Sequence, residues 1–370
     1  MSVRLTRLQL RGFKTIRDLE FFPQPINVLI GANGAGKSNF VSFFRLMSWM
    51  MSPPGNLQEH IGASGGASAI LHDGAGVTRE IDAHLTLETE RGENEYLFRL
   101  VWAAGDTVIF TDERYRFSAS GFQGKAPWQE LGAGHREAKL LERAEGGDVT
   151  ARTILSLLRK CVVYQFHNTS STARIRTRWS ATDSRWLKED GANLAPFLLR
   201  LREAAPPYYK RIVETARLII PFFADFELDG DRGTVLLQWR ERGSDVVFNA
   251  SQASDGMLRM LAIVALLGQP ESDLPAVLIL DEPELGLHPY GIEVIAGMLR
   301  AASQHAQILV ATQSTAFLDR FEPEDIVVVN RVGRESTFER LAPEQLSEWL
   351  EEYTLSELWE KNVLGGRPGR

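Results

Sequence analysis

The chain has 370 residues, with 41 Lys and Arg against 48 Asp and Glu, so its formal net charge at pH 7 is −7. With 44% hydrophobic and 24% charged residues, its composition is that of an ordinary globular protein and excludes disorder as the main state. The length predicts two domains, or one large domain with an insertion. No apolar run approaches the roughly 20 residues that span a bilayer, and the N-terminus has no secretory pattern, so we expect a cytoplasmic protein without a membrane partner. The single cysteine, Cys161, excludes an internal disulfide and a multi-cysteine zinc site, and we expect it to be a buried packing residue.

Hydrophobic periodicity predicts the elements in chain order. The N-terminal half should hold strands at 3–10 and 26–30, a helix at 37–51, and an antiparallel meander at 79–90, 94–103 and 107–119. Residues 135–220 are mainly helical in pattern, with one apolar run from Cys161 to Phe166 and helices near 149–160, 193–203 and 208–219. After two or three strands at 222–248, the chain alternates helix 254–268, strand 276–280, helix 289–302, and strands 307–311 and 326–330. Such alternation predicts an α/β fold with a mostly parallel sheet that is covered on both faces.

We divide the chain into four parts on this basis. Residues 1–121 form an N-terminal lobe with the meander, and residues 122–222 form an inserted helical subdomain or lid. Residues 223–340 form a C-terminal lobe, and residues 341–370 form an acidic tail with a helix at about 343–361.

Charge is distributed unevenly along the chain. From Arg159 to Lys188 there are seven basic residues and one acidic residue, whereas from Glu335 to Glu360 there are eight Glu and one Arg. An acidic protein can therefore carry a basic face, as binding to nucleic acid or to an acidic partner requires. A solvated loop and a solvated tail helix are the alternatives for the two segments.

Residues 31–38 read GANGAGKS, the pattern Gly-x-x-x-x-Gly-Lys-Ser, directly after an apolar strand and directly before a helix. In this context the pattern predicts a P-loop, in which backbone N–H groups and the helix N-terminus bind phosphate oxygens. Lys37 would reach the β and γ phosphates, and the Ser38 hydroxyl would bind Mg²⁺. We therefore expect ATP and Mg²⁺ as ligands.

A second motif, AVLILDE at 276–282, is an apolar strand that ends in two carboxylates. A strand without polar residues should be central in the sheet, which places both carboxylates at the edge of the ligand site. We expect Asp281 to hold the Mg²⁺ shell and Glu282 to orient and deprotonate the attacking water.

The stretch SQASDGMLRML at 251–261, some 20 residues before the second motif, resembles the signature sequence of ABC-class ATPases. That resemblance implies a head-to-tail dimer, in which Ser254 and Gly256 of one subunit close on the γ-phosphate held by the P-loop of the other. Within the class, RLTRLQLRGFKTIRDLEF, INVLIGANGAGKSNF and DEPELGLHP resemble the SMC and RecF branch, specifically its small, coiled-coil-free predicted ATPases of the AAA family. The implied fold is a P-loop NTPase of the ABC-type ATPase head, with an antiparallel β subdomain and an inserted helical subdomain. The resemblance implies that the nucleotide is bound by Gly31, Asn33, Gly34, Ala35, Gly36, Lys37, Ser38, Asn39, Ser254, Asp255, Gly256 and Gln165, and that Mg²⁺ is held by Ser38, Asp281 and Gln165.

Two positions depart from the pattern of the class. The usual switch His is replaced by Gln313, which can bind a phosphate or water but cannot accept a proton as His does, so we predict slow or gated hydrolysis with Glu282, Lys37 and Gln313 as catalytic residues. The Gln of the Q-loop, which contacts the metal or the attacking water in relatives, is matched by Gln165, with His167 as an alternative that stays open. By position, Arg11 and Lys14 are candidates for a place near the nucleotide, and solvated surface residues are the alternative.

The first hypothesis for function is an ATPase that dimerises on ATP and clamps or senses double-stranded DNA, in DNA repair or anti-phage defence. Its contacts would be to phosphates, through Arg174, Arg176, Arg178 and Lys188 and through the N-terminal Arg4, Arg7, Arg11 and Lys14. The second hypothesis is a regulatory ATPase that holds and releases a separate nuclease or toxin, with the acidic C-terminal helix as its docking element. A transporter ATPase is a third, minor alternative.

Overall fold

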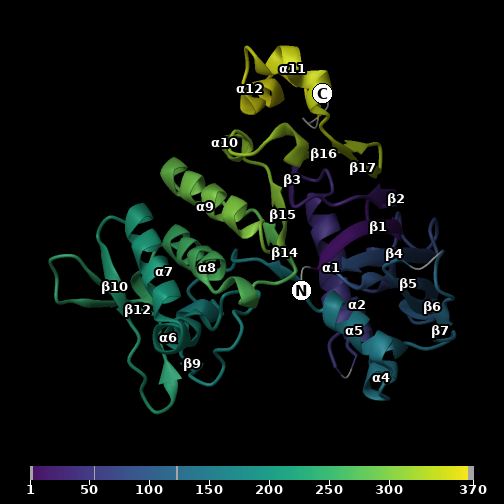
Figure 1. Cartoon of the computed structure of the whole chain (residues 1–370), viewed down its shortest axis with the longest axis horizontal. Coiled ribbons are helices and arrows are strands. Elements are labelled where there is room, and N and C mark those ends of the chain that lie inside the picture. Colours follow the sequence, from purple (N-terminus) through teal and green to yellow (C-terminus); the bar gives the residue numbers. More distant parts are fainter. Residues whose placement is uncertain (1–2, 54, 122–123, 366–370) are drawn as a thin grey trace.

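The computed structural model describes residues 3–53, 55–121 and 124–365 and consists of two six-stranded sheets with helices packed on them (Figure 1). The core sheet has the strand order β17-β16-β3-β15-β14-β8 and is parallel except for its edge strand β17. Its strands are β3 (Ile26–Ile30), β8 (Cys161–Tyr164), β14 (Val277–Asp281), β15 (Gln307–Thr312), β16 (Ile326–Val332) and β17 (Glu335–Arg340). The predicted α/β class and mostly parallel core sheet are confirmed.

The strands of the core sheet are apolar on both faces because both faces are covered. In β14, Leu278 and Leu280 point into one hydrophobic core and Val277 and Ile279 into the other, as the alternation of side chains in a strand requires. The first core contains α6 (Leu194–Ala204), α7 (Pro206–Ile219), α8 (Asp255–Gly268) and α9 (Pro289–Ala302). The second contains α1 (Lys37–Met50), α2 (Leu57–Ala63), α3 (Ala67–Ile70), α4 (Lys139–Glu145) and α5 (Val149–Leu158).

The second sheet is antiparallel and has the order β2-β1-β4-β5-β6-β7. Its strands are β1 (Arg4–Phe13), β2 (Ile16–Phe21), β4 (Glu80–Thr89), β5 (Gly92–Ala103), β6 (Thr107–Ala119) and β7 (Gln129–Glu130). The predicted meander is therefore confirmed, and it continues onto the N-terminal hairpin. In Figure 1 this sheet lies on the opposite side of the molecule from α6 and α7.

The segment 122–222 is divided between the two halves of the protein. α5 packs on β5 and β6, β8 is an edge strand of the core sheet, and α6 and α7 pack on α8. Between β8 and α6 the chain forms loops that hold one turn of 3-10 helix (Arg174–Arg176) and the short strand β9 (Trp179–Ser180), which pairs with β11 (Thr234–Val235). The predicted helical character thus holds at the two ends of the segment and fails in its middle. That the segment acts as a single lid remains a prediction. Residues 122 and 123 lie outside the described residues.

The remaining elements include a small antiparallel sheet of β10 (Phe223–Glu227), β12 (Gln238–Glu241) and β13 (Val247–Asn249) beside α7. The C-terminal part corrects the prediction of one helix at 343–361, because it forms α11 (Pro343–Leu350) and α12 (Leu355–Glu360). The break occurs because Thr354 starts a new helix, accepting a hydrogen bond from the backbone N–H of Glu357. α12 packs on α10 (Thr315–Leu318), with Leu358 and Trp359 buried. No helix in the described part of the chain is both long and apolar enough to cross a membrane.

Candidate functional site

The P-loop joins β3 to α1, as the motif predicts. Gly34 and Gly36 have φ angles of 79° and 119°, which L side chains rarely adopt. A Cβ on Gly36 would also lie 2.1 Å from the hydroxyl oxygen of Ser336 in β17. The loop therefore needs glycine at this position both for its conformation and for the close approach of the last strand.

Lys37 points back over its own loop. Its side chain is 6% exposed, and Nζ donates hydrogen bonds to the carbonyl oxygens of Gly31 at 2.5 Å and Ala32 at 3.1 Å. Burial lowers the pKa of Lys37, and the negative charges of Glu282 and Asp281 oppose that shift. The lysine thus lies within electrostatic reach of both predicted carboxylates, and phosphate oxygens would replace the two carbonyls as its acceptors.

Asp281 ends β14 and is 7% exposed. Gln165, which follows the neighbouring strand β8, donates from Nε2 to Asp281 Oδ2 at 3.1 Å. His167 Nε2 donates to the backbone oxygen of Asp281 at 2.9 Å, and His167 Nδ1 lies 3.0 Å from Gln165 Nε2. Burial raises the pKa of Asp281. Of the two Q-loop candidates, Gln165 reaches the carboxylate and His167 reaches the main chain, so the geometry favours Gln165.

Glu282 has a φ of 44°, in the left-handed region that is strained for a glutamate, and its N–H donates to the oxygen of Ala311 at 2.7 Å. Its Oε1 accepts a hydrogen bond from Gln313 Nε2 at 2.8 Å. The structure thus brings the predicted catalytic base and the residue in the switch position into direct contact. Both lie at the carboxyl ends of the paired strands β14 and β15, where ligands bind in open α/β sheets.

The oxygen donors at this edge fit a magnesium ion. Ser38 and Asp281 offer a hydroxyl and a buried carboxylate, and Mg²⁺ takes oxygen ligands, usually from one or two protein groups together with phosphates and water. Within the described ranges no group of three or more His, Cys, Asp or Glu could hold a metal ion. Gln165 Oε1 accepts a hydrogen bond from Arg45 in α1, so a metal contact through this oxygen would displace that arginine.

The predicted signature lies at the start of α8. Ser254 caps this helix by accepting from Met257 N–H at 3.2 Å. A Cβ on Gly256 would lie 2.5 Å from the oxygen of Gly286, so the helix start packs directly on the segment that follows Asp281 and Glu282. α8 and α1 cover opposite faces of the core sheet. Within one subunit the signature and the P-loop are therefore on different faces.

Several polar residues at the site were not predicted to have a role there. Arg259 donates to the backbone oxygens of Phe166 at 3.3 Å, His167 at 3.0 Å and Leu285 at 3.2 Å, which ties α8 to the Gln165 loop and to the segment after Glu282. The one available signal was an arginine inside the otherwise apolar run Met257 to Leu267.

Thr15 and Ser336 were missed as well, because they come from opposite ends of the chain. Ser336 Oγ donates to the oxygen of Ala35 at 2.6 Å and lies 2.6 Å from Thr15 Oγ1. Asn39, predicted to bind nucleotide, donates from Nδ2 to Thr15 Oγ1 at 2.7 Å. In this structure Asn39 therefore braces the loop, whereas Asn33 and Ser38 are exposed.

The basic segment is only partly available to a ligand. Arg178 is exposed, and Arg174 and Lys188 are ion-paired with Asp190 at 3.1 Å and Asp183 at 3.0 Å. Arg176 corrects the prediction of a nucleic-acid contact. Its side chain is 9% exposed, and it binds Asp255 at 2.9 Å and the backbone oxygens of Thr169, Ala250 and Ala253. It is occupied in fixing the signature segment.

Two of the N-terminal basic residues form ion pairs at the surface. Arg7 pairs with Glu20 at 2.6 Å and Arg11 with Asp18 at 3.0 Å, across the β1–β2 hairpin. Burial, together with the charge of Arg45, lowers the pKa of Lys14.

Cys161 is buried, and burial raises the pKa of its thiol to about 12, which confirms its expected packing role.

Comparisons with known proteins agree with this geometry. Residues 26–319 match the family described as "AAA domain, putative AbiEii toxin, Type IV TA system". No curated protein sequence matches the chain. One similar solved structure is the SmcHead bound to the C-winged helix domain of ScpA, with 13% identity, a TM-score of 0.60, and coverage of 93% of this chain and 99% of that one. An Smc head domain with an extended coiled coil, bound to the C-terminal domain of ScpA and derived from Pyrococcus furiosus, has 13% identity, a TM-score of 0.58 and coverage of 95% and 99%. An Smc head domain from Pyrococcus yayanosii has 12% identity, a TM-score of 0.55 and the same coverage.

At these identities the solved structures establish the fold, and the family match, which spans most of the chain, establishes membership. The chain therefore belongs to this AAA-domain family of P-loop ATPases and has the fold of an SMC head, an ABC-type ATPase head.

Proposed function

We propose that the protein hydrolyses ATP with Mg²⁺, dimerises when ATP is bound, and uses this closure to clamp or sense DNA. One observation carries the proposal: three adjacent strands, β8, β14 and β15, place the predicted site residues side by side at their carboxyl ends. These residues are Gln165 after β8, Asp281 and Glu282 at the end of β14, and Gln313 after β15. The two carboxylates also lie within electrostatic reach of Lys37. A nucleotide-binding protein without catalysis would not need a glutamate held in a strained backbone conformation and hydrogen-bonded to a glutamine.

Each residue of the site has its own role in the proposed hydrolysis. The P-loop amides and Lys37 would bind the phosphates, and Ser38 and Asp281 would hold Mg²⁺, whose chemistry there would be to neutralise negative charge on the phosphates. Glu282 accepts a proton from the attacking water, and Gln313 orients that water beside it. Because a glutamine cannot accept the proton as a histidine would, hydrolysis is slow or gated.

Closure requires a second copy of the chain. Ser254 and Gly256 lie on the face of the sheet opposite to α1, so the partner's signature supplies the remaining donors to the γ-phosphate. Glu282→Gln should trap an ATP-bound dimer, whereas Lys37→Ala should remain a monomer at saturating ATP. Light scattering after gel filtration measures both, and a Glu282→Gln protein that stays monomeric with ATP would overturn the sandwich model.

The DNA role rests on Arg174, Arg178 and Lys188 and on the solvent-accessible Arg4, Arg7 and Arg11, whereas the side chain of Arg176 is buried and bound to the signature segment. Phosphate contacts make such binding sequence-tolerant and steeply dependent on salt. The test is ATP hydrolysis with and without linear duplex DNA at one moderate salt concentration, with Glu282→Gln as the blank. A higher hydrolysis rate in the presence of DNA supports the DNA-clamp proposal, and an unchanged rate overturns it.

A second candidate is a regulatory switch that holds a separate nuclease or toxin partner. It is favoured by Trp349 of α11, which is 45% exposed beside the exposed carboxylates of Glu348 and Glu352. α12 is an unsuitable docking element because Leu358 and Trp359 are buried against the protein itself. Trp349→Ala should abolish capture of such a partner while sparing ATP binding, and retention of the partner would exclude this surface.

A further inference from the structure

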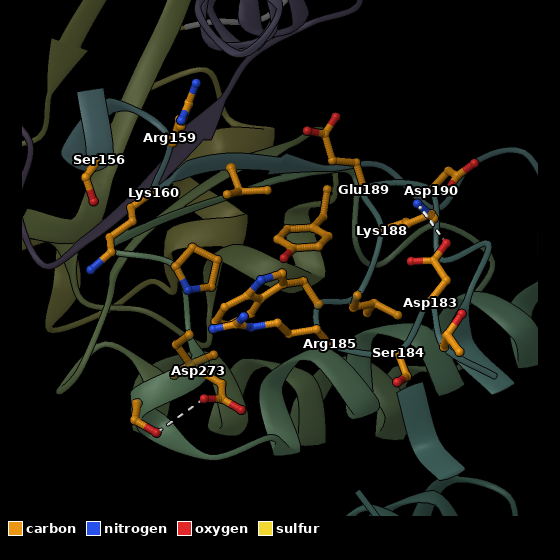
Figure 2. A pocket seen from close by; sticks show the side chains of 18 of the residues that line it. Ser156, Arg159, Lys160, Asp183, Ser184, Arg185, Lys188, Glu189, Asp190 and Asp273 are labelled. Atoms are coloured by element: carbon orange, nitrogen blue, oxygen red, sulfur yellow. Dashed lines mark hydrogen bonds and ion pairs between the residues drawn. The ribbon is translucent and has the colours of Figure 1, made fainter. Parts of the chain in front are cut away.

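A cleft of about 1030 Å³ lies beside the edge strand β8, away from the P-loop. Its walls are the end of α5, β8 itself, the loop 182–190 and the segment 272–275 that precedes β14. In the view of Figure 2, Arg185 lies between Lys160 on one side and the pair of Asp183 and Lys188 on the other. This volume is at the upper end of the range for small-molecule sites, so the cleft has room for a larger ligand.

The cations of this cleft outnumber the carboxylates that are free to neutralise them. Three of its four carboxylates are ion-paired: Asp183 with Lys188 at 3.0 Å, Asp190 with Arg174 at 3.1 Å, and Asp273 with Arg200 at 3.6 Å. In contrast, Arg152, Lys160 and Arg185 have no acidic partner among the described residues. The cleft thus offers unpaired positive charge to an anionic ligand.

Two aromatic rings lie beside cations of this cleft. Trp186 lines the cleft and is 52% exposed, and the guanidinium carbon of Arg185 lies 5.3 Å from the centre of its ring. Nearby, Trp179 is flanked by Arg174 at 4.7 Å and Lys188 at 5.4 Å. An exposed aromatic ring among cations, as at Trp186, is the combination that binds unpaired nucleic-acid strands, because a base stacks on the ring while the cations bind the phosphates.

The cleft is connected to the ATP site through one of its walls. The backbone N–H of Gln165 donates to the oxygen of Glu189 at 2.9 Å, and the side chain of Gln165 donates to Asp281. Ser48 of α1 also donates to the Glu189 carboxylate, at 3.4 Å. A ligand that shifts the loop 182–190 would therefore shift Gln165 relative to Asp281.

We propose that this cleft binds an unpaired nucleic-acid strand, with a base stacked on Trp186 and phosphates at Arg152, Lys160 and Arg185, and that its occupancy adjusts the ATPase through Glu189 and Gln165. The inference rests on the proposed function and deepens it, since it assigns an unpaired strand to Trp186, Arg152, Lys160 and Arg185, next to the Arg174 and Lys188 that are proposed to bind the duplex. Charge and stacking together favour a nucleic-acid strand over an acidic protein segment, which would use the cations alone.

The experiment compares fluorescent oligothymidylate with a blunt duplex, by anisotropy, on the full chain at one moderate salt concentration. Trp186→Ala should weaken oligothymidylate binding by roughly tenfold or more, the usual effect of removing one stacking ring, and should leave duplex binding within twofold. Phe22→Ala removes an equally exposed ring outside the cleft and should change neither. Lys160→Glu should weaken binding of the oligonucleotide, and the control Arg91→Glu should not.

The outcomes separate this inference from the function on which it rests. If the duplex binds and stimulates hydrolysis while Trp186→Ala and Lys160→Glu bind oligothymidylate as the unaltered chain does, the cleft assignment is overturned and the clamp survives. If neither nucleic acid binds, both proposals fail. If poly-glutamate occupies the cleft with an affinity that Trp186→Ala does not change, and oligothymidylate does not compete, the ligand is an acidic protein segment and the proposal is wrong.

Discussion

Gln313 donates a hydrogen bond from Nε2 to Oε1 of Glu282 across 2.8 Å, which joins the ends of two neighbouring strands of the core sheet. A histidine in this position could exchange a proton with Glu282. The side-chain amide of Gln313 cannot, and only holds the Glu282 carboxylate in one orientation. The pair therefore fixes the direction of the carboxylate without supplying a second acid or base.

Gln313→Ala should lower the ATP hydrolysis rate by about 10²-fold, within the range of losing a positioning contact to a general base, while leaving ATP affinity unchanged. A coupled phosphate-release assay and fluorescent-nucleotide binding measure the two quantities. The exposed Gln304→Ala serves as the control. Full ATPase activity in Gln313→Ala would remove this residue from the mechanism.

Gln165 and His167 should differ in their response to magnesium. Gln165 contacts the carboxylate of Asp281, whereas His167 contacts its backbone oxygen. Gln165→Ala should therefore raise the Mg²⁺ concentration needed for half-maximal hydrolysis several-fold, and His167→Ala should leave it nearly unchanged. A magnesium titration at saturating ATP distinguishes them, and the opposite order would assign the Q-loop role to His167.

Glu284 should make the stability of the nucleotide-free protein depend on pH. Burial raises its pKa from 4.5 to about 7, against the effect of a hydrogen bond from Thr312, and its Oε2 has no partner. Because the folded-state pKa is raised, the contribution of this group to stability is complete below pH 4.5 and is lost as the pH rises through about 7. Glu284→Gln cannot ionise, so its free energy of unfolding should rise relative to that of the unaltered chain between pH 5 and pH 8, by an amount on the order of a few kcal/mol, and its Tm should rise with it. A constant Tm difference over this range would show that Glu284 does not titrate there.

Arg259→Met should uncouple α8 from the segments that flank the site. The change removes three hydrogen bonds to backbone oxygens and leaves those oxygens without their donors, which should lower the free energy of unfolding by about 2–4 kcal/mol. It should also reduce ATP-dependent dimerisation at temperatures where the variant is folded, because Arg259 ties the signature helix to Leu285. Thermal melts and light scattering test the two effects, and dimerisation equal to that of the parent chain would limit Arg259 to a role in stability.

The parts of the site that the sequence predicts are those in which function and local structure coincide. GANGAGKS and AVLILDE specify a loop and a strand end by themselves, and Ser254 is both a helix cap and part of a motif. Arg259, Thr15 and Ser336 escaped prediction because their partners are backbone atoms or residues far along the chain, which leave no local pattern. The charge count failed at Arg176 for a related reason. The sequence shows that a residue is basic, but it does not show which carboxylate will form an ion pair with it in the fold.

The position of β3 in the core sheet has a consequence for synthesis. β3 comes early in the chain, yet both of its neighbours come from its last fifth: Val28 pairs with Val310 of β15 on one side and with Ile326 of β16 on the other. Such distant pairings form slowly, and domains complete as their chain emerges from the ribosome. The P-loop of a nascent chain therefore has no finished sheet to support it until β16 has been made. Nucleotide binding should thus appear as one of the last events in folding and can report that the whole head has assembled.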